Sequence, residues 1–415
     1  MASGEELSPA GKMLLEPSMN CYVIATIGLK TRIDPQVIRE GLSQTLLKHS
    51  RFTSKLAKEG GKIKWIPTRV ELEKHIIVPE IDSNIEDPDR FVEDYISHFT
   101  KTSLDQSKPL WEVHLLNIKT SNAEAVAIFR IHHSLGDGAS LISLLLAVTR
   151  KTSDPHALPT VPTQNRDSSH HSSSQFSCFF AIWWGLLLIW HTLVDMLLSL
   201  LTIFFIRDTP TPLKGAPGVG LNIKRFVNRT VSMDDIKLVK NQMQTDLADM
   251  MAEKSKVKWG NRMGYIILPF HIALYEDPLE YIRKAKDRID RKKHSLEAIC
   301  SYTCSKAVHN LLGAKVAAAM TERLLLNTTI AFSNVAGPVE EISFYGHPVA
   351  YIAPTVYGLS NALTIHFQSY ANKMTISLAV DPLVIPDPYL LCDDLEQSLK
   401  LITDAVQRKN IVDLV

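Results

Sequence analysis

Residues 132–138 of this 415-residue chain read HHSLGDG, and their types and spacing suit the movement of a proton. A strand-like run precedes them at 125–131, and apolar residues at helical spacing follow at 139–150. A neutral imidazole at the end of a buried strand can take the proton of a bound hydroxyl. The glycines permit the sharp turn that aims the ring. The alternative is two histidines at a strand end with ordinary turn residues.

The rest of the composition argues against several other chemistries. The formal net charge is +1 and no long basic run occurs, so a nucleic-acid partner is not expected. Cys300 and Cys304 are the only close cysteines, and such a pair without nearby partners is a poor metal signature. A G-x-S-x-G elbow is missing, so a serine acyl-enzyme has no support. We therefore expect that a group passes from one bound substrate to the other without a covalent enzyme intermediate. We expect no bound metal or cofactor.

The chain divides into two halves around an apolar segment. We expect a first half at 1–150, a Ser/Pro/His-rich linker at 151–175, an apolar segment at 176–206, a second linker at 207–220 and a second half at 221–415. In both halves, strand-like runs alternate with amphipathic helices, which predicts an α/β (α+β) fold. The second half ends with a hairpin around 371–373 and a final amphipathic helix.

The segment 176–206 is almost wholly apolar, with Asp195 as its only formal charge. It exceeds the roughly 18 residues of a membrane-spanning candidate, and Trp183, Trp184 and Trp190 suit an interface. Two crossings need roughly 34 residues, more than this segment has. Since both halves must share one side to build one site, we expect a re-entrant or in-plane anchor, although hydropathy alone predicts one transmembrane helix. The alternative is a helix buried in a soluble core.

Several segments together resemble the plant wax ester synthase/diacylglycerol acyltransferases. They are Pro109-Leu110-Trp111-Glu112, the HHSLGDG run, Ser333-Asn334-Val335-Ala336-Gly337-Pro338 and the run 340–354. The resemblance extends from Leu7 to about Arg408, with the motifs in the family's order. Plant soluble acyltransferases and peptide-synthetase condensation domains share only the His-x-x-x-Asp-Gly core. The Asp-Phe-Gly-Trp-Gly motif of the soluble plant branch is missing here, which argues against that branch.

The resemblance implies a two-domain CoA-dependent acyltransferase fold, a chloramphenicol acetyltransferase-like sandwich with a tunnel between the halves. It implies His133 as the general base, His132 as its support and Asp137 as an orienting residue of the turn. The implied reaction transfers a long-chain acyl group from acyl-CoA, a co-substrate, to a fatty alcohol, with diacylglycerol as a further candidate acceptor. Acyl-CoA supply favours the endoplasmic reticulum membrane, with the cell membrane as alternative and the active site facing the cytosol.

Other candidate residues carry open alternatives. The tetrahedral intermediate needs a donor for its oxyanion, and Asn334 or a backbone N–H of the Gly337 loop is a candidate against plain loop structure. Trp111 either shapes the acyl tunnel or is a buried tryptophan at a strand start. The basic run 291–294 either meets CoA phosphates or forms a solvated helix face.

One departure from the family pattern falls at Thr245-Asp246, where several dozen residues of the family are missing. The missing part holds one of the family's recognised motifs and, as the resemblance implies, a helix of the second domain's core, so we expect exposed apolar surface. Two functional classes therefore stay open. One is a membrane-anchored acyltransferase, and the other is a catalytically impaired relative that binds lipid or modulates a partner in the membrane.

Overall fold

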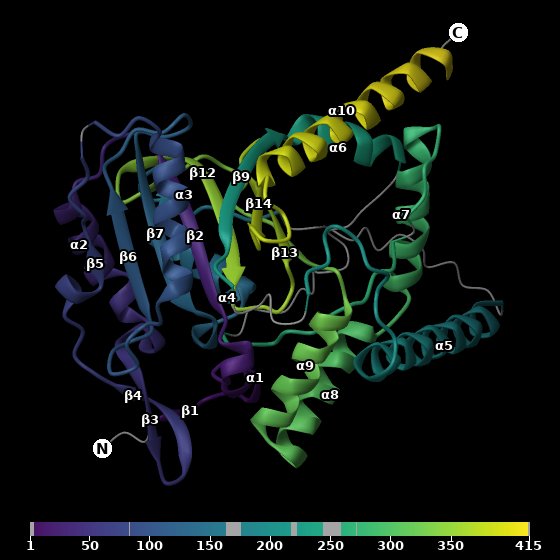
Figure 1. Ribbon diagram of the computed structural model, residues 1–415, viewed down its shortest axis with the longest axis horizontal. Helices are drawn as coiled ribbons and strands as arrows, with labels where there is room; N and C mark the ends of the chain where they lie inside the picture. Colours follow the sequence, from purple (N-terminus) through teal and green to yellow (C-terminus); the bar gives the residue numbers. More distant parts are fainter. Residues whose placement is uncertain are drawn as a thin grey trace.

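The computed structural model describes residues 4–82, 84–162, 176–216, 222–243, 259–270 and 272–413. Two large sheets form its centre, and helices pack against them (Figure 1). The predicted α/β (α+β) arrangement of two halves is confirmed.

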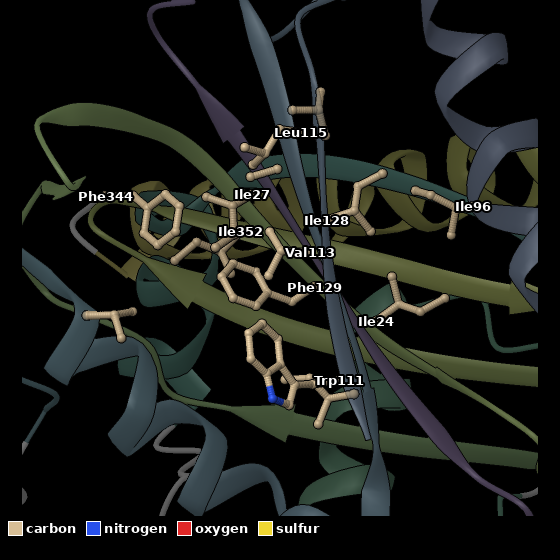
Figure 2. Close-up of a cluster of buried hydrophobic side chains, with 14 of the residues drawn as sticks. Ile24, Ile27, Ile96, Trp111, Val113, Leu115, Ile128, Phe129, Phe344 and Ile352 are labelled. Atoms are coloured by element: carbon tan, nitrogen blue, oxygen red, sulfur yellow. The ribbon is translucent and has the colours of Figure 1, made fainter. Parts of the chain in front are cut away.

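The first half is built on a sheet of seven strands. In spatial order they are β5 (Ile76–Ile77), β6 (Trp111–Leu116), β7 (Ala125–His132), β2 (Tyr22–Leu29), β12 (His347–Tyr357), β11 (Ile342–Phe344) and β8 (Thr149–Lys151). A separate three-stranded sheet holds β1 (Glu5–Glu6), β4 (Lys62–Pro67) and β3 (Ser54–Glu59). The helices of this half are α1 (Pro9–Met13), α2 (Pro35–Gln44), α3 (Pro88–His98) and α4 (Gly138–Val148). Apolar side chains of β2, β6, β7 and β12 meet in one core (Figure 2).

Helices α2 and α3 begin in the same way, with a capping carboxylate followed by proline. Oδ1 of Asp34 and Oδ1 of Asp87 each accept a backbone N–H of the first turn at 2.9 Å. Such a cap satisfies a donor that the helix leaves unpaired, and proline at the first position has no N–H to lose.

The second half is built on a sheet of four strands. In spatial order they are β10 (Ile330–Val335), β13 (Leu363–Tyr370), β14 (Lys373–Val380) and β9 (Arg225–Ser232). Its helices are α6 (Met233–Met243), α7 (Pro278–Lys293), α8 (Glu297–Leu312), α9 (Ala314–Asn327) and α10 (Pro388–Asp413). The predicted hairpin is β13 with β14, which pair from Leu363↔Val380 to Tyr370↔Lys373. The final helix α10 packs against α6 and α7 (Figure 1).

The chain of the second half returns to the sheet of the first. Strand β12 pairs antiparallel with β2, and β11 pairs with β8. The expected boundary at 221 therefore does not separate the two sheets, because residues 342–357 belong to the seven-stranded one. These paired strands are far apart in the sequence, so no local pattern predicts that residues 342–357 join the first sheet. As a result, segments before and after the apolar stretch share one sheet and lie on one side of any membrane.

The apolar stretch forms one long helix, α5 (Phe176–Phe204), which projects from the second half beside α8 and α9 (Figure 1). Within it, Ala181–Phe204 is long and apolar enough to cross a membrane, with 22% of that window buried. Large apolar side chains such as Trp190 and Leu193 are more than 60% exposed. A buried helix in a soluble core would hide these side chains, so the structure argues against that alternative.

A polar stripe on α5 faces the protein. Thr192, Asp195, Ser199 and Thr202 recur at three- and four-residue spacing, which places them on one face of the helix. Thr192 Oγ1 accepts the N–H of Leu296 at 2.9 Å, and the carbonyl of Thr202 accepts an N–H of the Asn327 side chain at 2.6 Å. The polar side chains of α5 therefore face the protein and its apolar side chains face outward, the reverse of a surface helix in a soluble protein.

An ion-pair network joins α5 to α7 and α8. The carboxylate of Asp195 is fully buried and pairs with Arg291 and with Nζ of Lys292, the latter at 3.0 Å. Nζ of Lys292 also pairs with Glu297 at 2.5 Å, and Glu297 accepts the hydroxyl of Ser199 at 3.3 Å. Two cations of the basic run 291–294 are therefore engaged with α5 and α8. The run is not the solvated face considered above, and these two cations hold the helix.

Candidate active site

The HHSLGDG motif forms the turn from β7 into α4. Strand β7 ends at His132, a 3-10 turn covers His133–Leu135, and Asp137 is the N-cap of α4. Oδ1 of Asp137 accepts the N–H of Ser140 at 2.9 Å, and Oδ2 accepts the N–H of Arg262 at 3.0 Å. Both carboxylate oxygens of Asp137 are thus occupied by backbone donors, in keeping with the orienting role implied for it.

His132 is held rigidly in its neutral form. Its Nδ1 accepts the backbone N–H of Ser134 at 3.1 Å, so Nε2 carries the proton and donates to Oδ1 of Asn20 at 3.0 Å. Burial, together with the neighbouring His133, lowers the pKa of His132 to about 3. The first histidine therefore stays uncharged and fixes the position of the turn.

His133 is held by its backbone, and its ring is buried. Its backbone N–H donates to the carbonyl of Cys21 at 2.9 Å, and its ring Nδ1 is buried without a hydrogen-bond partner among the described residues. Burial lowers the pKa of His133 below its ordinary value of 6.5. The imidazole is thus neutral at physiological pH, the form that a general base needs.

A short segment of the second half clamps the motif. We call Trp259–Arg262 the clamp, because each of its residues contacts the turn. Nε1 of Trp259 donates to the carbonyl of Leu135 at 2.7 Å, and the carbonyl of Gly260 accepts the N–H of Asp137 at 2.9 Å. The amide of Asn261 donates to the carbonyls of His133 and Ser134 at 2.9 and 3.0 Å. No sequence motif marks this segment, and its partners are far away along the chain.

We expect Asn261→Ala to lower turnover about tenfold with a smaller effect on substrate affinity. The substitution leaves two buried carbonyls without their donor, which costs about 1–3 kcal/mol and loosens the turn that aims His133. Steady-state kinetics on purified protein measure the effect on kcat and KM. The matched control is Asn122→Ala, because Asn122 is exposed and its amide donates to the hydroxyl of the neighbouring Ser121. Unchanged kcat in Asn261→Ala would show that the clamp does not position the histidine.

A buried polar layer faces away from the core of the second half. Its residues alternate with the apolar residues of the hairpin and are Thr364, His366, Gln368, Thr375 and Ser377. Nδ1 of His366, Oε1 of Gln368 and Oγ of Ser377 have no hydrogen-bond partner among the described residues. Buried polar atoms are nearly always paired, so unpaired ones indicate a place for a ligand or water.

His366 links this polar layer to the motif. Burial, and then the charge of His133, lowers the pKa of His366 to about 4, which means that the two imidazoles lie within electrostatic reach. The prediction of this hairpin from the sequence rests only on the apolar alternation of Leu363, Ile365 and Phe367. The polar residues that alternate with these apolar residues are the feature of the sequence that could have pointed to His366.

The two residues proposed as oxyanion donors, Asn334 and Gly337, do not belong to the polar layer of His366. In the β10–β13 register, Asn334 lies beside Phe367, on the face opposite to His366. The N–H of Gly337 donates to the hydroxyl of Ser369 at 3.1 Å. A Cβ at Gly337 would come within 2.1 Å of the carbonyl of Ser369, so only glycine fits this close approach. Their role as oxyanion donors stays a prediction.

Trp111 lies in the core of the first half. Its ring is 1% exposed, and Nε1 donates to the carbonyl of Phe52 at 2.9 Å. It stacks on the ring of His75 with a centroid distance of 4.4 Å (Figure 2 shows Trp111 among the core side chains). These contacts correspond to the alternative of a buried tryptophan at a strand start.

Comparison with solved structures defines the class of fold. A wax ester synthase/diacylglycerol acyltransferase from Marinobacter aquaeolei VT8 aligns with a TM-score of 0.62 at 18% identity, over 97% of this chain and 100% of that one. The starter condensation domain of rhizomide synthetase, solved with C8-CoA and Leu-SNAC, aligns with a TM-score of 0.58 at 11% identity, over 98% and 95% of the two chains. The fold is therefore that of the two-domain acyltransferases and condensation domains, as predicted.

Sequence comparison identifies the family. The wax ester synthase/diacylglycerol acyltransferase catalytic domain matches residues 34–251, and the C-terminal domain of the same family matches 259–403. Wax ester synthase/diacylglycerol acyltransferase 11 of Arabidopsis thaliana is 46% identical over 99% of this chain and 97% of its own length. Wax ester synthase/diacylglycerol acyltransferase 5 of the same plant is also 46% identical, over 98% of this chain and 94% of its own length. The chain belongs to the wax ester synthase/diacylglycerol acyltransferase family, so it is an acyl-CoA-dependent O-acyltransferase, as predicted.

The chain is nevertheless shorter than its relatives. The alignment with the first relative runs over 470 positions whereas this chain has 415 residues, so at least 55 positions have no residue here. The predicted junction at Thr245-Asp246 lies outside the described residues. In the segment that follows the clamp, Phe270, Ile272 and Leu274 are at least 61% exposed. Such exposure is what the loss of a packed element would produce.

Proposed function

We propose that the chain transfers a long-chain acyl group from acyl-CoA to a fatty alcohol and so makes wax esters, with diacylglycerol as a second acceptor. The observation that carries the proposal is a clamped His133 that burial keeps neutral, in a molecule that also holds a buried layer of polar atoms without partners among the described residues. The condensation domain with the same fold was solved with C8-CoA, which supports an acyl-CoA donor for this arrangement.

In the proposed reaction, the ring of His133 takes the proton of the alcohol while the alcohol oxygen attacks the thioester carbonyl. In the neutral imidazole one ring nitrogen carries the proton and the lone pair of the other is the base. The tetrahedral intermediate then expels the CoA thiolate, which takes the proton from His133. Ser377 lies opposite His366 in the hairpin, and its hydroxyl, buried and unpaired among the described residues, is a candidate donor to the oxyanion on this face.

The proposed function is tested by expression in a cell that makes no neutral lipid. The native chain should yield wax esters, and triacylglycerol if diacylglycerol is an acceptor, when lipid extracts are analysed by mass spectrometry. A chain that is present, folded and membrane-bound but yields neither ester would instead support the catalytically impaired alternative. The 55 or more missing positions are the observation that favours this second candidate.

We also propose that α5 anchors the chain in the plane of the endoplasmic reticulum membrane, with the site facing the cytosol. Three observations support an in-plane anchor. The apolar faces of α5 point outward, its polar stripe is bound to the protein, and strands from before and after it share one sheet. An in-plane helix with its apolar side in the lipid would bring hydrophobic substrates to the enzyme.

We expect the pair Leu193→Glu and Leu197→Glu to release the protein from membranes. Both side chains are more than 55% exposed on α5, and placing two charges in the lipid costs about 2–3 kcal/mol each. Membrane and soluble fractions of expressing cells measure the release. Leu383→Glu is the control, since Leu383 is exposed to a greater degree but lies outside α5. Retention of the double variant in the membrane fraction would contradict the anchor.

A further inference from the structure

A groove lies where the end of α5 meets α9. It measures about 280 Å³ and is lined by Ile203, Phe204, Lys315, Val316, Ala319, Met320 and Arg323. The seven residues combine an apolar floor with two cations, and no carboxylate is among them. This composition is unlike that of a core defect, which would be apolar throughout.

The two cations lie on one face of α9. Lys315, Ala319 and Arg323 are spaced by four residues, so they follow one another along the same side of the helix. Both cations are exposed, and neither has an ion-pair partner among the described residues. This is unlike Lys292, whose charge is neutralised by the network that holds α5. The groove therefore carries two positive charges that are free to meet an anion.

The apolar part of the groove is continuous with the outward face of α5. Phe204 is 47% exposed, and Phe205 and Ile206 directly after it are exposed as well. A ligand that matches this surface has an apolar chain beside a compact negative charge. Acyl chains and phosphodiesters of membrane lipids meet these two requirements in one molecule.

We propose that this groove binds the headgroup of an anionic phospholipid of the membrane in which α5 lies. The phosphate meets Lys315 and Arg323, and the acyl chains run along Phe204 onto α5. The stems of both cations can lie along the apolar floor while their charged ends reach the headgroup level. The proposal rests on membrane association through α5 and is independent of catalysis, since the groove is lined by none of the motif, clamp or polar-layer residues.

The test compares binding of the full-length protein to vesicles of phosphatidylcholine alone and of phosphatidylcholine with phosphatidylserine. The native protein should prefer the anionic vesicles. The double variant Lys315→Gln and Arg323→Gln should bind them about 30-fold more weakly, because each cation near an anionic surface contributes about 1 kcal/mol. Binding to pure phosphatidylcholine should not change, because the apolar face of α5 remains.

The control is Lys58→Gln with Lys101→Gln, two exposed lysines of the first half that give the same change in net charge. A control that loses as much affinity as the double variant would show a net-charge effect and overturn the site. Unchanged affinity of the double variant for anionic vesicles would overturn it as well. Ester synthesis with detergent-dispersed substrates is measured in parallel and should be the same in all variants. A native protein without ester synthesis would defeat the proposed function alone, because the vesicle comparison does not depend on turnover.

Discussion

Replacement of His133 with alanine should lower kcat by about 10²–10⁴-fold, the usual contribution of a general base. The alcohol then has no group to take its proton as it attacks the thioester. The fold should persist, because the contacts that hold this position are made by its backbone N–H and carbonyl. Steady-state ester synthesis by purified protein, with thermal unfolding of the same samples, measures both effects.

The matched control is His98→Ala, since His98 is exposed in the last turn of α3. The pH profile gives a second readout of the same histidine. Its neutral form is active and its pKa is lowered by burial, so activity is lost as pH falls through a value below 6.5. An acid limb at or above 6.5, or a variant as active as the control, would contradict the assignment of the base.

Replacement of Asp195 with alanine should destabilise the protein by about 3 kcal/mol. It leaves Lys292 buried with one carboxylate instead of two, and removal of one partner of a buried pair typically costs 3–5 kcal/mol. The remaining contact of Lys292 with Glu297 favours the lower end of this range. Denaturant unfolding of the purified protein measures the loss, and the fraction of α5 that becomes accessible to protease measures its release.

A second variant separates the ion pair from the packing of the helix. Asp195→Leu combined with Lys292→Met removes both charges and keeps apolar volume, so much of the lost stability should return. If the double variant is no more stable than Asp195→Ala, the network is not what holds α5 against the protein.

The predictable features of this molecule are those whose signals are local. The run 125–131 and the glycine-containing turn after it correctly predicted that His133 follows a buried strand, because alternation, burial and turn chemistry act within a few residues. The hairpin of β13 and β14 follows from the same kind of pattern. The family resemblance then predicted the two-half fold.

The unpredicted features depend on contacts between distant segments. Strand β12 pairs with β2 more than 300 residues away, and the clamp reaches the motif across more than 120 residues. Neither partner has a sequence pattern that specifies the other. His366 was overlooked because the hairpin was interpreted by its apolar side alone. The run 291–294 was interpreted as a phosphate site or a solvated face, because the sequence does not show that Asp195 comes beside it.

The shortened chain keeps the parts that the proposed reaction needs. The motif, the clamp and the polar layer are all in place, and exposed apolar side chains follow the clamp at Phe270, Ile272 and Leu274. The presence of these parts favours an active enzyme over an impaired relative.

Release of the CoA thiol by the purified native chain tests the central claim most directly. With acyl-CoA and a fatty alcohol, we expect one thiol for each ester formed, and no rapid release when the alcohol is left out, since transfer is direct. No release in the presence of alcohol, or release that does not require alcohol, would contradict a histidine-catalysed transfer between two bound substrates.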